Sequence, residues 1–235
     1  MSDDRKITGN RGALERTPTP TATETRWWWI RHAPVINPGN RIYGRGDLDA
    51  DCNDAALYDG LAAMLPDDAL WLASPLRRTH QTAAAIHVAD GRHERARQPL
   101  IEPDFVEQDF GDWQGLSWAE LEARDEKRYH RFWLAPAHQA PPGGESFDVL
   151  VGRVAAAIAR LTNAHAGRDI VAVAHGGPIR AALAFALGID AERALGFAIA
   201  NCSVTRLDHF SDPNTPGGIW RVAMVNQLPG RVRRR

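Results

Sequence analysis

Arginine and histidine side chains follow three separate apolar segments of the sequence. Arg31 and His32 come directly after the run Trp27–Ile30, while Arg78 and His175 follow two later apolar runs. Histidine can act as a nucleophile, and the planar guanidinium of arginine can bind phosphate oxygens with two parallel hydrogen bonds. Two imidazoles and two guanidiniums in one cleft would form a site for a doubly charged tetrahedral anion, for which phosphate is the obvious ligand. The residue types therefore predict phosphate chemistry.

The elements that must position these side chains are strands alternating with helices. Strands are predicted at Arg26–Arg31, Leu70–Ala73 and Asp169–Ala174, where bulky apolar residues favour a packed sheet. Helical patterns at Arg77–Val88 and Pro178–Leu187 follow the second and third of these strands. Such alternation predicts a parallel sheet covered by helices on both faces. Because the carboxyl ends of parallel strands share one edge of the sheet, the four side chains are expected to converge there.

Two further helices are predicted, at Ser117–Phe132 and Ser146–Thr162. Ser117 precedes Glu120 by three residues, which is the spacing of a capping box, and the second helix has a serine as its N-cap. Glu145, directly before that serine, is expected to interact with the helix dipole, with a supporting role at the site as the alternative. The remaining predicted elements are two strands, Ser203–Leu207 and Gly218–Val225, around a turn at Ser211–Gly217, and loops at 34–54 and 135–145.

The composition is that of a soluble globular protein, with 44% apolar and 24% charged residues. A net charge of −1 argues against non-specific binding to nucleic acids or membrane surfaces, both of which need a strong positive excess. No stretch reaches membrane-spanning length, and the two cysteines, Cys52 and Cys202, cannot form a disulfide framework. We therefore expect a cytoplasmic enzyme with no nucleic-acid or membrane partner.

A chain of 235 residues is long enough for one filled core and short for two ordinary domains. The predicted domain spans residues 26–228. Residues 1–25 are polar, contain Thr-Pro repeats and are expected to form a disordered N-terminal extension. Residues 229–235 are expected to form a solvated basic tail.

Five short motifs follow one another along this domain. They are Arg31-His32, Ser74-Pro75-Leu76-Arg77-Arg78 with Gln81-Thr82-Ala83, the segment Glu107–Gly115, Gly144-Glu145-Ser146, and Ala174-His175-Gly176-Gly177. In this order they resemble the histidine phosphatase superfamily, in its phosphoglycerate mutase-like branch 1, over roughly residues 26–228. The resemblance implies a three-layer α/β/α sandwich with a mostly parallel central sheet. It also implies a phosphatase that works without a metal or a cofactor.

The resemblance further implies a role for each of five residues. His32 would be the nucleophile and become a phosphohistidine. Arg31, Arg78 and His175 would bind the phosphate oxygens and stabilise the charge that develops in the transition state. Glu107 would protonate the leaving oxygen and then, as a carboxylate, deprotonate the attacking water.

Other side chains near the motifs leave alternatives open. Asp109 is the reserve candidate for the acid, because in an extended segment its side chain lies on the same face as that of Glu107. Arg41, Tyr43 and Arg45 are candidates for contacts with the non-phosphate part of the substrate. They could equally be ordinary solvated residues of the loop.

The loop after His32 departs from the family pattern. Ala33 stands where most members have glycine, and Pro38 stands where an asparagine is usual. A similar Arg-His-Ala-Pro start occurs in members that resemble α-ribazole phosphatases. These differences leave phosphoryl transfer as the expected chemistry but weaken any transfer of substrate identity.

Three functions are compatible with these motifs. Hydrolysis is favoured, because the short segment between Glu107 and Gly144 gives water better access to a phosphoenzyme than a longer lid would. A phosphoglycerate mutase-like phosphotransferase is the first alternative. A weakly active phosphate-binding or regulatory protein is the second, including a phosphatase of phosphohistidine proteins. The expected partners are a small phosphorylated metabolite and a second copy of the chain in a homodimer.

Overall fold

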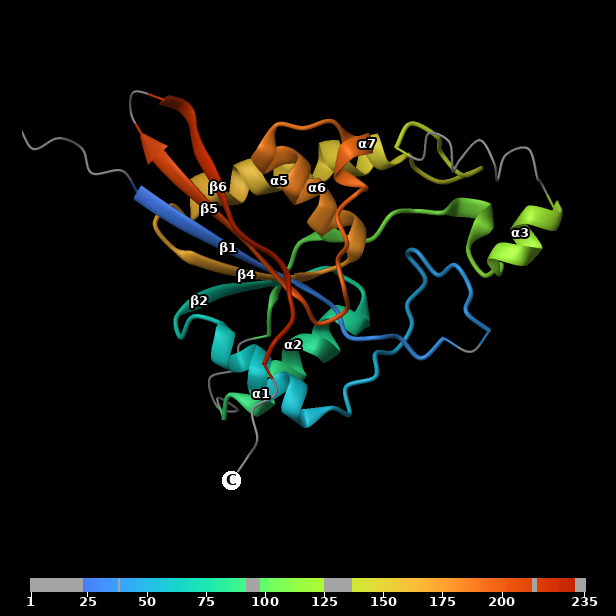
Figure 1. Cartoon of the computed structure of the whole chain (residues 1–235), viewed down its shortest axis with the longest axis horizontal. Coiled ribbons are helices and arrows are strands. Elements are labelled where there is room, and N and C mark those ends of the chain that lie inside the picture. Colours follow the sequence, from blue (N-terminus) through green and yellow to red (C-terminus); the bar gives the residue numbers. More distant parts are fainter. Residues whose placement is uncertain (1–22, 38, 92–97, 125–136, 213–214, 231–235) are drawn as a thin grey trace, which may run out of the picture.

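A six-stranded sheet forms the centre of the molecule in the computed structural model, which describes residues 23–37, 39–91, 98–124, 137–212 and 215–230 (Figure 1). The strand order is β3-β2-β4-β1-β5-β6. The first four strands in this order are parallel, and β5 and β6 are antiparallel to their neighbours. The strands are β1 (Thr23–Arg31), β2 (Ala69–Ala73), β3 (Leu100–Ile101), β4 (Asp169–Ala174), β5 (Val204–Asp212) and β6 (Thr215–Gln227).

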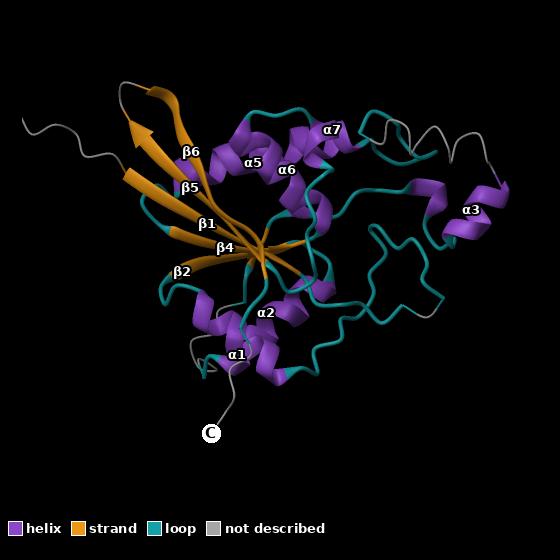
Figure 2. Cartoon of the chain, in the orientation of Figure 1, coloured by secondary structure: helices purple, strands orange, loops and turns teal. Residues whose placement is uncertain are grey.

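Helices cover both faces of the sheet (Figure 2). α1 (Ala55–Met64) and α2 (Arg77–Ala89) pack on one face, and α5 (Phe147–Ala164) and α6 (Gly176–Leu187) pack on the other, each pair around its own apolar core. This arrangement confirms the predicted three-layer α/β sandwich. The shorter helical elements are α3 (Trp118–Arg124), α7 (Ala191–Ala194) and two 3₁₀ turns, η1 (Pro103–Phe105) and η2 (Gly111–Trp113). No helix in the described ranges is long and apolar enough to cross a membrane.

The bulky apolar residues of β1 pack into both cores of the molecule. Successive side chains of a strand point to opposite faces, so Trp27 and Trp29 enter the core under α5 and α6, while Trp28 and Ile30 enter the core over α1 and α2. The rings of Trp27 and Trp29 stack with centroids 5.3 Å apart, and Phe105 packs against both. Buried on both sides, β1 is a rigid support for the residues at its carboxyl end.

The parallel strands end at a common edge, as the sequence predicts. Arg31 pairs in register with Ala174 at the end of β4, and the amide of His32 donates to the Ala174 carbonyl over 2.9 Å. The amide of Ser74, directly after β2, donates to the carbonyl of Val173 over 3.2 Å. The ends of β1, β2 and β4 therefore bring their three following segments together.

The predicted limits of the domain need correction at both ends. β1 begins at Thr23, so Thr23–Thr25 of the predicted extension belong to the sheet and pair with β5. At the other end Pro229 is buried, and the backbone of Gly230 lies against Gly60 of α1. Both corrections have the same cause, because backbone pairing and packing extend past the last apolar residues of the pattern. Residues 1–22 and 231–235 lie outside the described part of the chain.

Most predicted helix starts are confirmed. The amide of Glu120 donates to Ser117 and the amide of Ser117 donates to the Glu120 carboxylate, so the capping box forms. Ser146 accepts from the amide of Val149 and caps α5. α3 is described only to Arg124, and the remainder of the helix predicted to Phe132 lies outside the described residues.

Several elements differ from expectation: β3 and α7 were not predicted, and α6 begins at Gly176 and not at Pro178. The turn predicted at Ser211–Gly217 is shorter, because β5 continues to Asp212 and β6 already begins at Thr215. The sequence pattern also missed α1, whose buried residues Tyr58 and Leu61 are too few to make a clear apolar stripe.

Candidate active site

His32 lies at the end of β1 with its ring completely buried. Its Nδ1 is 2.6 Å from the carbonyl oxygen of Ala33, and because a carbonyl only accepts, Nδ1 carries the hydrogen. Nε2 of the neutral ring therefore carries no hydrogen and has a free lone pair. This nitrogen has no hydrogen-bond partner among the described residues. Burial, and then the charges of Arg78 and Arg31, lower the pKa of His32 from 6.5 to about 3. The ring is thus held neutral with its nucleophilic nitrogen free.

The backbone around His32 is fixed from two sides. Thr82 of α2 accepts from the amide of Ala33 over 2.9 Å, and Asn201 donates to the carbonyl of His32 over 2.8 Å. The side chain of Ala33 is fully buried in the core formed with α1 and α2. The methyl group that replaces the family's usual glycine hydrogen therefore has a packing role in this chain.

Arg78, in the first turn of α2, is fully buried and uses all of its guanidinium nitrogens. Its Nη1 and Nη2 donate to the carbonyls of Gly46 and Gly44 over 2.7 and 2.8 Å, and Nε donates to Nδ1 of His175 over 3.2 Å. The ring of Tyr43 lies 5.0 Å from its central carbon. Burial lowers the pKa of Arg78, which makes an anionic ligand especially favourable beside it.

His175 directly follows β4 and lies fully buried, with its ring centroid 5.0 Å from that of His32. Its Nδ1 accepts from Arg78, so the hydrogen of the neutral ring is on Nε2, which lies 2.6 Å from Oγ of Ser74. Burial, followed by the proximity of His32 and Arg78, holds the pKa of His175 well below 6.5. Both ring nitrogens thus have protein partners.

Arg31 reaches the same region from the end of β1. Its Nη1 donates to the carbonyl of Ile199 over 2.5 Å, while its buried Nε has no partner among the residues described. A Cβ added at Gly176 would lie 3.8 Å from this Nε. The guanidinium of Arg31 therefore lies next to the N-terminus of α6, where partial positive charge favours an anion.

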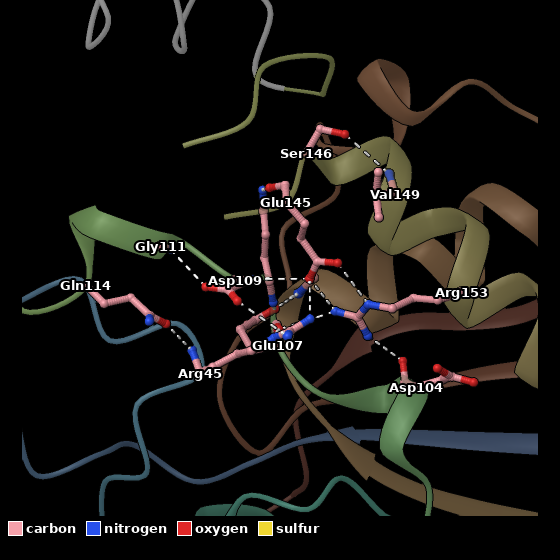
Figure 3. Close-up of polar contacts among 12 residues, drawn as sticks. Arg45, Asp104, Glu107, Asp109, Gly111, Gln114, Glu145, Ser146, Val149 and Arg153 are labelled. Atoms are coloured by element: carbon pink, nitrogen blue, oxygen red, sulfur yellow. Dashed lines mark hydrogen bonds and ion pairs between the residues drawn. The ribbon is translucent and has the colours of Figure 1, made fainter. Parts of the chain in front are cut away.

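Glu107 and Asp109 lie close in sequence but face different neighbours (Figure 3). Oε1 of Glu107 accepts from the amide of Gly177 in α6 over 3.1 Å, and a side chain at that glycine would collide with it. Asp109 instead accepts from the amide of Gly111 over 2.8 Å and lies 3.4 Å from Arg45. The geometry therefore favours Glu107 over Asp109 as the carboxyl group of the site, since only Glu107 touches the residues beside His175.

The three substrate-loop candidates lie in different surroundings. Tyr43 lies beside His32, with their ring centroids 6.5 Å apart. Arg41 is exposed and bonds to the carbonyl of Gly115 and to Glu120, so it stabilises the loop next to α3. Arg45 forms ion pairs with Asp109 and Glu145. Tyr43 thus contacts His32 and Arg78 through its ring, and Arg45 contacts Glu107 and Asp109 through its guanidinium.

Several polar residues at the site lie outside the motifs that are recognisable in the sequence. Arg180 of α6 donates to the carbonyl of Phe197, and burial lowers its pKa, while Glu107 acts in the opposite direction. Asn201 and Arg153 likewise reach the site from segments without a recognisable motif. Their separation in sequence from His32 is set by the fold and not by a local pattern. In the described ranges, no group of three or more His, Cys, Asp or Glu side chains could hold a metal ion.

Known proteins are similar to this chain in fold and in sequence. A mycobacterial glucosyl-3-phosphoglycerate phosphatase structure matches with a TM-score of 0.73 and 27% identity, covering 87% of this chain and 99% of that one. A bifunctional protein of Mycobacterium tuberculosis is 31% identical over 197 residues, which are 84% of this chain and 49% of that protein. A metal-independent phosphoserine phosphatase of Arabidopsis thaliana is 30% identical over 159 residues, covering 65% of this chain and 64% of that protein.

The chain spans about half the length of the mycobacterial relative it matches over 197 residues. The family model that matches describes the histidine phosphatase superfamily (branch 1), and it covers residues 27–216. This range runs from β1 into β6 and includes Arg31, His32, Arg78, Glu107 and His175. The chain belongs to the histidine phosphatase superfamily, branch 1.

Proposed function

We propose that this chain hydrolyses a small phosphomonoester through a phosphohistidine formed on His32. The observation that carries the proposal is the state of the His32 ring. Nδ1 donates a hydrogen bond to the carbonyl of Ala33, and the pKa of the ring is lowered to about 3. The buried Nε2 has no hydrogen-bond partner among the described residues. A lone pair held in this way beside two guanidiniums is suited to attack on phosphorus.

In the first proposed step, Nε2 of His32 attacks phosphorus in line with the leaving oxygen. The N–P bond forms as the ester P–O bond breaks, and Glu107 gives its proton to the departing oxygen. Arg31 and Arg78 stabilise the negative charge on the three other oxygens. His175 can contact the phosphate once one of its ring nitrogens exchanges its present partner.

In the second step, the ionised Glu107 takes a proton from water as the water oxygen attacks the phosphohistidine. The N–P bond breaks, inorganic phosphate leaves, and His32 returns to its neutral form. The arginines supply the positive charge that a metal supplies in other phosphatases. The proposed reaction therefore uses neither a metal ion nor a cofactor.

The names of the relatives favour hydrolysis over transfer of the phosphoryl group to a second hydroxyl. The Arabidopsis thaliana relative and the mycobacterial neighbour are both named as phosphatases, one for phosphoserine and one for glucosyl-3-phosphoglycerate. A small phosphorylated metabolite is therefore the proposed substrate. We further propose a cytoplasmic location, on the basis of the charge balance and of two cysteines that form no disulfide. A homodimer is proposed separately.

The first test is hydrolysis of p-nitrophenyl phosphate and of a panel of phosphorylated metabolites by the purified chain. Phosphate release is expected from the wild type and is expected to be lost in His32→Ala. Retained activity in His32→Ala would contradict the covalent mechanism. A wild type that binds phosphate but hydrolyses no member of the panel would favour the binding-protein alternative, and interconversion of phosphoglycerates would favour a mutase.

A further inference from the structure

Glu145, which directly precedes the N-cap of α5, lies at the centre of a buried ion-pair network (Figure 3). Its side chain is only 11% exposed. Oε1 accepts from Arg45 over 3.0 Å, from Arg153 over 2.7 Å and from the amide of Asp109 over 3.1 Å. Oε2 accepts from Nε of Arg153 over 3.1 Å. One carboxylate thus joins the loop after β1, the helix α5 and the segment that carries the proposed acid.

The two arginines held by Glu145 converge on one backbone group. Nε of Arg45 and Nη2 of Arg153 each donate to the carbonyl oxygen of Glu107 over 3.3 Å. Nη1 of Arg153 also donates to the carbonyl of Asp104, three residues earlier in the same segment. The backbone of Glu107 is therefore held by two guanidiniums that come from different parts of the fold.

The backbone of Glu145 adds further bonds to the same segment. Its amide donates to the carbonyl of Asp109 over 2.9 Å, and its carbonyl accepts from the side chain of Gln108 over 3.0 Å. Together with the side-chain bonds, these contacts fix Glu107 and the two residues that follow it. From this held backbone the side chain of Glu107 reaches α6, where its Oε1 accepts from the amide of Gly177.

The arrangement depends on the charge of Glu145. Two guanidiniums that share one carbonyl oxygen repel each other, and the carboxylate between them compensates this repulsion. Burial acts against the charged form of Glu145, but the hydrogen bonds and charge of Arg153, the Asp109 amide and the charge of Arg45 lower its pKa overall. Removal of the carboxylate would take its ion pair from Arg153, would leave Arg45 with Asp109 as its acidic partner among the described residues, and would weaken the hold of both guanidiniums on the carbonyl of Glu107.

We infer that Glu145 is a positioning residue for general acid catalysis, because through Arg45 and Arg153 it holds the backbone of Glu107, whose carboxylate accepts from the amide of Gly177 close to His175. The inference rests on the proposed function, in which Glu107 protonates the leaving oxygen. Glu145 itself touches no reacting atom. A displacement of about 1 Å at the acid is enough to lower a rate by about 10²-fold, so a loosened backbone is expected to weaken proton transfer while the nucleophile stays in place.

A selective effect on the acid can be recognised by the leaving group of the substrate. The 2,4-dinitrophenolate ion leaves without being protonated, whereas phenol and simple alcohols need a proton in the transition state. The quantity to compare is kcat/KM, because it reports the steps up to formation of the phosphohistidine and not its hydrolysis. A defect in the acid alone therefore appears with phenyl phosphate and is small with 2,4-dinitrophenyl phosphate.

The variant to measure is Glu145→Gln, which keeps the shape of the side chain but removes its charge. We expect kcat/KM for phenyl phosphate to fall by about 10- to 10²-fold, within the usual contribution of a general acid, and kcat/KM for 2,4-dinitrophenyl phosphate to change little. The matched control is Asp208→Asn, in β5. Asp208 is also a buried carboxylate with two arginine partners, Arg206 at 2.7 Å and Arg221 at 2.6 Å, and it touches none of the site residues described above.

Two additional measurements separate positioning from a general loss of folding. Arg45→Ala, at a half-exposed position, removes one of the two bonds to the Glu107 carbonyl and is expected to show the same leaving-group selectivity to a smaller extent. Hydrogen exchange of the Asp109 amide, which donates to Glu145, is expected to accelerate in Glu145→Gln and to stay unchanged in Asp208→Asn.

An equal loss with both substrates, no loss with either, or the same selectivity in Asp208→Asn would overturn the positioning role. These results are distinct from failure of the proposed function. That failure would show as a wild type without turnover of either substrate, or as activity that survives in His32→Ala, and it would remove the basis of the inference as well.

Discussion

Nε of Arg78 donates a hydrogen bond of 3.2 Å to Nδ1 of His175. Because a guanidinium can only donate, this single contact assigns the tautomer of His175 and directs its Nε2–H to Ser74, 2.6 Å away. The remaining two nitrogens of Arg78 are held by backbone carbonyls. A buried cation and a neutral imidazole thus hold each other in place beside His32.

Arg78→Lys is expected to lower kcat/KM by about 10²- to 10³-fold, as loss of a transition-state donor does. A lysine amine cannot reach His175 and both glycine carbonyls with the geometry of a guanidinium. The matched control is Arg77→Lys, because Arg77 is an exposed neighbour that pairs with Asp47 and Asp49 at the surface. Steady-state kinetics of both variants test this, and equal activity of the two would contradict the role of Arg78.

Glu107→Gln is expected to lose about 10²- to 10⁴-fold in kcat/KM with phenyl phosphate, the range of a general acid. Asp109→Asn is expected to lose much less, since Asp109 faces Arg45 and the amide of Gly111 and not α6. The comparison is made with one substrate at one pH. If Asp109→Asn is inactive while Glu107→Gln is unimpaired, the acid is Asp109.

Lower pH is expected to destabilise the protein through its buried histidines. Burial lowers the pKa of His32 from 6.5 to about 3, so between these values the unfolded chain binds a proton that the folded chain does not. Stability therefore falls as the pH drops below about 6.5, by up to about 1.4 kcal/mol per pH unit for each such group. The direction is the same for His175.

The check is urea unfolding of the wild type and of His32→Asn at pH 7 and pH 5 in a buffer free of phosphate. The variant is expected to lose less stability between the two pH values than the wild type. An identical pH dependence in both proteins would show that His32 is already protonated in the folded state at pH 5.

Treatment with a chelator such as EDTA, followed by removal of the chelator, is expected to leave kcat and KM unchanged. The proposed mechanism places all of the positive charge at the phosphate on arginines, chiefly Arg31 and Arg78. Metal analysis of the purified protein accompanies the assay. A large loss of activity that added Mg²⁺ or Zn²⁺ restores would overturn the metal-independent mechanism.

The convergence of the site residues could be predicted from local sequence. The aromatic run before Arg31 marks a buried strand, and polar groups after such strands meet at one edge when the strands are parallel. The structure places His32, Arg78 and His175 together at that edge. The helix caps at Ser117 and Ser146 could also be predicted, because a cap depends on residues that are only three positions apart.

The supporting contacts could not be predicted in the same way, because they join segments far apart in the chain. Asn201 and Ile199 bond to His32 and Arg31 from a loop more than 160 positions later. The sequence makes Arg45 a candidate for substrate binding, but its partner Glu145 is 100 positions away. Such contacts follow from tertiary packing, which leaves no periodic pattern in the sequence.

The most direct test of the proposed mechanism is to trap the phosphoenzyme. Wild-type protein mixed rapidly with a phosphomonoester that it hydrolyses, and quenched at alkaline pH where phosphohistidine survives, is digested and examined by mass spectrometry. The proposal predicts one added phosphoryl group on the peptide that contains His32, and none in the same peptide from His32→Asn. Turnover without any phosphorylated His32 peptide, or with the phosphoryl group on another residue, would contradict it.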